Sequence, residues 1–171
     1  MRRNALPALF AALVIVHGSA GAADYYSGRA RVIDGDTISI RNQRIRIAAI
    51  DACERDQTGL KGGKVWRCGV AARSYLRKMI DGQHVRCDII DQDQYRRLVG
   101  QCFIGDVDIG LAMVKAGLAE AMLRYLPATH SISEVEYGQA ESRARDGGYG
   151  MWSAEIESPH EYRRSKSSRI P

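Results

Sequence analysis

This chain lacks several features that would place it in other classes of protein. After residue 22 it has no apolar run that approaches the ~20 residues a membrane-spanning helix needs. It has no Cys-x-x-Cys pair, and its four cysteines are spaced 15, 19 and 15 residues apart, a poor pattern for structural zinc. No internal repeat and no linker divides it. At 171 residues, it has room for one domain with a real hydrophobic core.

Most of the chain also has no net positive charge. The formal net charge is +5, but it comes from Arg2, Arg3 and the last twelve residues; the remaining body has 19 charges of each sign. Coating nucleic acid through bulk charge requires a basic surface, so any affinity for phosphate must be local. Residues 158–171 are rich in Ser and Arg without periodicity. We predict a disordered basic tail there, able to contact nucleic acid weakly and nonspecifically.

The first 22 residues are organised like a secretory signal peptide. Arg2 and Arg3 precede an apolar run at 5–16, and small residues follow at 20–22. An uncleaved membrane anchor is the alternative, but the run is shorter than the ~20 residues of a spanning helix. We therefore predict a cleaved signal peptide at 1–22 and a folded domain at 23–157. The protein would be periplasmic or secreted, without stable membrane association.

Export makes disulfide bonds the expected state of Cys53, Cys68, Cys87 and Cys102. Three pairings are possible. Cys87 and Cys102 lie in two apolar runs that flank a turn, which favours a bridge between strands and leaves Cys53 with Cys68. Two alternatives stay open: Cys53 pairs with Cys87 or Cys102, or it remains a free thiol.

Apolar periodicity and turn residues predict an α+β domain of five strands and three helices, in the order β-β-β-α-β-β-α-α. The first helix covers 69–80 and ends at Asp81-Gly82; the second is capped by Asp106 or Asp108; the third opens at Ser133. The strands cover 29–33, 37–41, 44–50, 83–90 and 98–104. This order suits a small closed barrel of the OB type, although order alone does not prove closure.

Acidic residues and arginines gather at three places along the chain. The three stretches are Asp34-Gly35-Asp36-Thr37, Arg46 to Glu54, and Asp93-Gln94-Tyr95-Arg96-Arg97. Carboxylate oxygens bind hard cations such as Ca²⁺ and Mg²⁺. A planar guanidinium binds phosphate through two parallel hydrogen bonds. Together these groups are typical of metal-assisted cleavage of a phosphodiester.

These motifs resemble the staphylococcal nuclease (thermonuclease) family. A lone Asp-Gly-Asp-Thr is weak, because Asp-Gly is common in hairpin turns, but three motifs in the family's order and spacing are specific. The similarity runs from about residue 28 to 152 and is carried by 32–38, 46–52, Glu54, 93–97, 117–119 and Gly150-Met151-Trp152. It implies an OB barrel and a monomeric, Ca²⁺-dependent, sugar-nonspecific nuclease that hydrolyses DNA and RNA and leaves 3′-phosphates.

The resemblance also implies roles for individual residues. Asp36, Asp51 and the backbone carbonyl of Ala52 would hold Ca²⁺. Glu54 would act as the general base or position the attacking water. Arg46 and Arg97 would bind phosphate and stabilise the charge of the transition state.

Tyr95 and Tyr125 match positions that contact the nucleotide, where stacking is worth ~1–3 kcal/mol per base. The chain departs from the family at Gln94, Leu123 and Cys53, which replace a lysine, a tyrosine and a proline. These changes bear on affinity and base preference rather than on the reaction type. The rival interpretation is a noncatalytic OB module that binds nucleic acid or a protein partner, but such modules usually lose the acids or arginines.

Overall fold

A computed structural model describes residues 25–168 of the chain. The predicted signal peptide at 1–22 lies outside the described residues. No helix within residues 25–168 is long and apolar enough to cross a bilayer. The elements fold around one main hydrophobic core, with a smaller cluster beside the Cys53–Cys68 disulfide.

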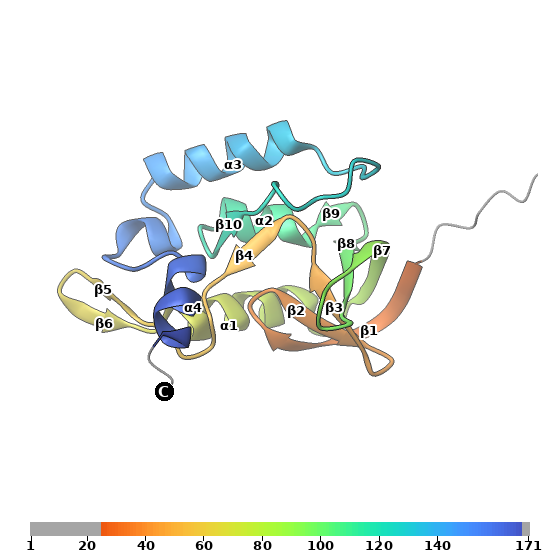
Figure 1. Ribbon diagram of the computed structural model, residues 1–171, viewed down its shortest axis with the longest axis horizontal. Helices are drawn as coiled ribbons and strands as arrows, with labels where there is room; N and C mark the ends of the chain where they lie inside the picture. The colour runs from red at the N-terminus through yellow and green to blue at the C-terminus, as the bar shows by residue number, and fades with distance from the viewer. Residues whose placement is uncertain (1–24, 169–171) are drawn as a thin grey trace, which may run out of the picture.

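Five strands close into a barrel, which confirms the predicted OB-type α+β fold (Figure 1). The order is β3-β2-β1-β7-β8, and parallel pairing of β3 with β8 closes the ring; the short β9 (Val107–Asp108) extends β8. Closure leaves these strands without a free edge. The barrel strands are β1 (Tyr25–Asp34), β2 (Thr37–Ile40), β3 (Gln43–Ile47), β7 (His84–Gln92) and β8 (Leu98–Ile104).

Successive side chains of β3 point alternately into the barrel core and out of it. Ile45 and Ile47 are buried in the barrel, while Arg46 between them is only half-buried. Successive strand residues point to opposite faces. The arginine is therefore held on the outer face of the barrel by the core packing of its two neighbours.

The predicted strand at 44–50 is wrong in one respect, because it breaks after Ile47. Ala49 has φ 63°, a left-handed conformation that a regular strand does not contain. The chain then forms β4 (Ile50–Ala52), which leaves the barrel and pairs with β10 (Ala119–Ala121). The break carries Asp51 and Ala52 away from the barrel wall.

The three predicted helices are present as α1 (Cys68–Ile80), α2 (Ile109–Lys115) and α3 (Glu134–Asp146). Asp108 caps α2 by accepting a hydrogen bond from Leu111 N at 3.1 Å, and Ser133 caps α3. The loop predicted between 52 and 68 contains a small hairpin, β5 (Gly59–Lys61) and β6 (Lys64–Trp66). A 3₁₀ helix, η1 (Gly150–Ser153), follows α3.

A fourth helix corrects the prediction of a disordered tail from residue 158. Pro159–Ser167 forms α4, which lies beside β4 in Figure 1. Ser158 and Glu161 form a capping box, and Pro159 occupies the first turn, where its missing N–H costs nothing. These local signals outweigh the polar composition of the segment.

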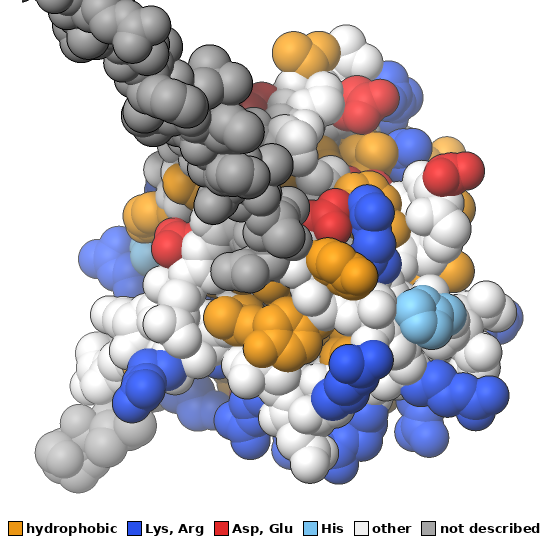
Figure 2. All heavy atoms as spheres, turned by 90° about the vertical axis from the view of Figure 1, so that its right-hand side faces the viewer, with side chains coloured by type: hydrophobic (Ala, Val, Ile, Leu, Met, Phe, Trp, Pro, Cys, Tyr) orange, Lys and Arg blue, Asp and Glu red, His pale blue; other side chains and the backbone are white. Residues whose placement is uncertain are grey.

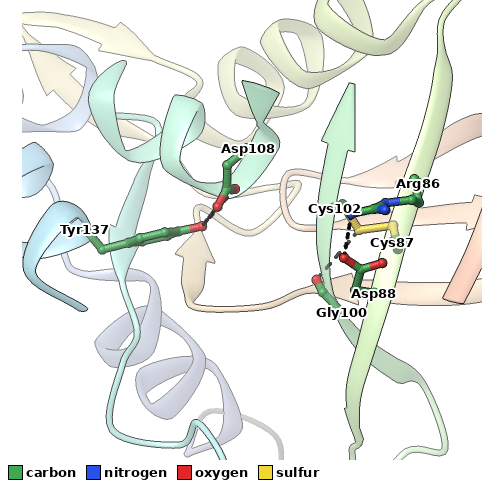
Figure 3. The surroundings of a disulfide bond; sticks show 7 residues. All are labelled: Arg86, Cys87, Asp88, Gly100, Cys102, Asp108 and Tyr137. Carbon is green, nitrogen blue, oxygen red and sulfur yellow. Dashed lines mark hydrogen bonds and ion pairs between the residues drawn. A yellow bond between two sulfur atoms is a disulfide. The ribbon is translucent and has the colours of Figure 1, made fainter. Parts of the chain in front are cut away.

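Both predicted disulfides, Cys53–Cys68 and Cys87–Cys102, are formed. Cys87 and Cys102 are register partners on β7 and β8, so this bridge lies within the barrel wall (Figure 3). The same figure shows Tyr137 of α3 donating to Asp108 at the start of α2, at 2.9 Å. The Cys53–Cys68 bridge instead joins the end of β4 to the start of α1.

Charged side chains are unevenly spread over the surface, which agrees with a body of zero net charge that has local basic regions. Figure 2 shows one face of the molecule, on which Lys and Arg side chains gather along the lower edge while acidic side chains lie higher up.

Candidate active site

The three acidic and basic motifs meet in one cleft of about 830 Å³. Each motif arrives from a different element: the turn between β1 and β2, the strands β3 and β4 with the loop that follows, and the turn between β7 and β8. The predicted site residues that line the cleft are Asp36, Arg46, Ala52, Glu54, Tyr95 and Arg97.

Arg46 links the two predicted metal carboxylates. Its Nη1 donates to Asp36 Oδ2, and its Nη2 donates to Asp51 Oδ1 and to the carbonyl of Ile50, both at 3.2 Å. Asp36 Oδ1 also accepts from Thr37 Oγ1 at 2.8 Å. One guanidinium therefore joins Asp36, which lines the cleft, to Asp51, which is buried behind it.

Asp51 is the most buried charged group of the site, with no exposed surface. Arg163 of α4 forms a two-pronged ion pair with it, at 2.8 Å from Nη1 to Oδ1 and 2.7 Å from Nη2 to Oδ2. Arg163 Nη1 also donates to Glu54 Oε1 at 3.1 Å. Hydrogen bonding to Asp51 raises the pKa of the Arg163 guanidinium above its ordinary value. A buried carboxylate needs such compensation, because an unpaired buried charge is strongly unfavourable.

Glu54 lies half-buried at the same end of the cleft. Burial raises the pKa of its carboxyl, and the hydrogen bond and charge of Arg163 oppose that rise. Burial likewise raises the pKa of Asp34 on the opposite turn. A raised pKa makes Glu54 a stronger base than a solvated glutamate, which suits proton transfer near neutral pH.

Arg97 is held by its own turn. Its Nε donates to Asp93 Oδ2 at 2.7 Å, and Nη1 lies 3.5 Å from Thr37 Oγ1. Asp93 Oδ1 accepts from the backbone N–H groups of Tyr95 and Arg97, both at 2.9 Å. Burial alone would raise the pKa of Asp93, but the hydrogen bonds from Arg97 outweigh it and lower that pKa. Asp93 thus orders the turn and aims Arg97 into the cleft.

The two predicted nucleotide-binding tyrosines are exposed. Tyr95 lies at the mouth of the first cleft, with the Arg97 guanidinium 5.7 Å from its ring centre. Tyr125 lines an adjoining cavity of about 560 Å³, together with Pro127, and that cavity shares Arg46, Arg97 and Tyr95 with the first. The two residues are 72% and 69% exposed, so each leaves ring surface available for stacking although an arginine lies over each ring.

The donor chemistry suits a hard cation. Within residues 25–168, no three His, Cys, Asp or Glu side chains gather as metal ligands; the predicted set has two carboxylates and one backbone carbonyl. These are all oxygen donors, and Asp51 already requires positive charge around it. The residues therefore fit a divalent cation in kind, with water completing its shell.

Arg163 is the site residue that sequence reasoning missed. Arg163 lies in residues 158–171, whose composition led to the prediction of a disordered tail. It is 112 positions from Asp51 in the sequence. Ser158-Pro159-His160-Glu161 carried the signal, because it combines the spacing of a capping box with a proline at the first helical position.

Fold and site together define an OB-fold domain with a cleft lined by carboxylates and arginines. The family described as "Staphylococcal nuclease homologue" matches residues 44–154. The chain belongs to this staphylococcal nuclease family, as its motifs predicted.

Known relatives agree with this assignment. The chain is similar to the "Succinoglycan biosynthesis protein ExoI" of Rhizobium meliloti, with 33% identity over 96% of this chain and 83% of that protein. It is also similar to the "Probable endonuclease lcl3" of Sclerotinia sclerotiorum, with 30% identity over 80% of this chain and 53% of that protein. A "Probable staphylococcal-like nuclease CAN1" of Oryza sativa is 29% identical over 77% of this chain and 36% of that protein. The chain thus spans about half or less of these two nuclease relatives, and the family supports a nuclease function in general terms.

Proposed function

We propose that this protein is an exported nuclease that uses Ca²⁺ to hydrolyse phosphodiester bonds of DNA and RNA and leaves 3′-phosphates. The observation that carries the proposal is the Arg46 bridge between Asp36 and Asp51, in the same cleft as Glu54 and Arg97. A site that only bound phosphate would gain nothing from a wall of carboxylates, which repel it.

Asp36, Asp51 and the carbonyl of Ala52 would hold the cation, which supplies Lewis-acid polarisation of a phosphoryl oxygen when bound. Arg46 and Arg97 would bind the scissile phosphate and stabilise the negative charge that builds up in the transition state. Glu54 would accept a proton from the attacking water, or hold that water in line. Tyr95 and Tyr125 would stack on the flanking bases, a contact that tolerates any sequence.

Export is supported by the leader pattern and by the disulfides, since such bonds persist in oxidising compartments. We expect the protein to act as a monomer in the periplasm or outside the cell. The curated names of the relatives are not uniform, because the ExoI name refers to succinoglycan biosynthesis rather than to nucleic acid. The main rival therefore remains a noncatalytic module that binds nucleic acid or a protein.

Cleavage assays separate these functions. The purified protein should cut single-stranded DNA and RNA in Ca²⁺, and excess EGTA with EDTA should stop it. Asp51→Asn should bind the cation poorly and lose cleavage in Ca²⁺. Analysis of the product ends should find 3′-phosphate. Nucleic-acid binding without cleavage under any cation would favour the binding module, and cleavage undiminished by chelators would refute the Ca²⁺ requirement.

A further inference from the structure

The C-terminal helix α4 places a positive charge on the carboxylate assigned to the cation. Both oxygens of Asp51 accept from Arg163, at 2.8 and 2.7 Å, and Asp51 Oδ1 also accepts from Arg46. Two guanidinium groups thus meet on one fully buried carboxylate. Two-pronged pairs of this kind are among the stronger hydrogen-bonded ion pairs in proteins.

A second ion pair fixes the far end of the same helix. Lys166 Nζ pairs with Asp56, two residues beyond Glu54, and this hydrogen bond lowers the pKa of Asp56. At the near end, Gln57 Nε2 donates to the carbonyl of Glu157 at 2.8 Å. The loop that carries Glu54 is therefore held to the chain around α4 through Arg163, Lys166 and Glu157, and Tyr162 adds a hydrogen bond to Asp56.

The attachment of α4 is polar and shallow. Pro159 is the one residue of the helix that is buried, and the Lys166–Asp56 pair is more than half exposed. Exposed ion pairs contribute little to stability, and apolar burial is what makes a docked helix hard to remove. The capping box of α4 does not depend on the loop, because Ser158 and Glu161 both belong to the helical segment.

We infer that α4 is a displaceable strap, in which Arg163 occupies both oxygens of Asp51, one of the two carboxylates proposed to hold the divalent cation. A cation bound to Asp51 and the Arg163 guanidinium repel each other, and Arg163 engages both oxygens of Asp51 whereas Arg46 engages Oδ1 alone. Cation binding therefore requires Arg163 to withdraw, and the closed strap keeps the site inactive at low cation concentration. This inference rests on the proposed function, but it concerns cation affinity rather than cleavage.

Direct titration of the purified protein with CaCl₂ by calorimetry, after removal of bound metal, tests the strap. If the strap is open about one tenth of the time, it lowers apparent affinity about tenfold, and Arg163→Gln should restore that factor. Lys166→Gln removes an exposed anchor and should raise affinity by less than about fivefold. Arg164→Gln is the matched control and should leave affinity unchanged, because the ion pairs from α4 to Asp51, Glu54 and Asp56 come from Arg163 and Lys166 and not from Arg164.

A purely structural role for Arg163 predicts a different pattern. Arg163→Gln would then lower the melting temperature equally with and without Ca²⁺, and would leave Ca²⁺ affinity unchanged or weaker. If α4 is a strap, Arg163→Gln should melt at a lower temperature than the wild type in chelator. Adding Ca²⁺ should then raise the melting temperature of the variant by more than it raises that of the wild type. Unchanged or weaker Ca²⁺ affinity in Arg163→Gln, or no Ca²⁺ binding by either protein, would overturn the strap. Tighter binding in a protein that cleaves nothing would support the strap and refute the nuclease.

Discussion

The two sides of the cleft hold arginines on the same carboxylate by different means. On the barrel side, Arg46 projects from β3 between two core residues, Ile45 and Ile47, in a strand paired on both edges. On the other side, Arg163 projects from α4, which buries Pro159 and is held mainly by polar contacts. A charge fixed by the core is suited to stabilise a transition state without rearranging, whereas a charge on a shallow helix is suited to leave.

The largest expected effect comes from the barrel side. Arg46→Lys and Arg97→Lys keep the charge but lose the planar fork, so we expect cleavage to fall by about 10²- to 10³-fold, the usual cost of losing one transition-state donor. The melting temperature should change little. Arg86→Lys is the control, because Arg86 pairs with Asp88 on β7 and lies outside the cleft. Wild-type rates in both cleft variants would refute their role in binding phosphate.

The two disulfides allow a matched test of how the position of a bridge affects activity. Each joins cysteines 15 residues apart, so a chain-entropy estimate gives the same loss of about 3 kcal/mol in unfolding free energy for either. Cys87→Ser with Cys102→Ser should lower stability measured by urea unfolding and leave the activity of the folded protein intact. Cys53→Ser with Cys68→Ser should lower both, because that bridge fixes the chain between Asp51 on β4 and Glu54 in the loop that follows. Equal effects of the two double variants on activity would show that the loop does not depend on its bridge.

A smaller effect concerns pH. Glu120 lies opposite Asp51 in the β4–β10 pair, and burial, followed by the charges of Glu141 and Asp51, raises its pKa from 4.5 to about 7. A folded-state pKa above the unfolded one means that the contribution of Glu120 is complete below pH 4.5 and is lost as pH rises through 7. The melting temperature in chelator should therefore rise as pH falls from 8 toward 5, and Glu120→Gln should flatten that change. A melting temperature that falls over this range, or an unchanged slope in the variant, would contradict this assignment.

Local signals in the sequence predicted most of the barrel side. Alternation identified the barrel strands and side-chain caps marked the starts of α2 and α3, while the resemblance to the staphylococcal nuclease family placed Asp36, Arg46 and Asp51 in one site. The break at Ala49 was not predictable, because alanine carries no mark of a positive φ. Arg163 was missed because a contact across 112 residues leaves no local periodicity, and because the capping box of Ser158 and Glu161 was not recognised in a segment of such polar composition.

Parallel neutralisation of the two arginines on Asp51 tests the account most directly. Arg46→Gln and Arg163→Gln each remove one guanidinium from the same carboxylate, so they match in charge and in partner. Initial rates of single-stranded DNA cleavage should be measured at a Ca²⁺ concentration that only partly activates the wild type. We predict opposite changes: Arg46→Gln loses cleavage, and Arg163→Gln cleaves faster than the wild type. A fall in both variants would contradict the account, because it would make Arg163 a phosphate-binding partner of Arg46 rather than a restraint on the site.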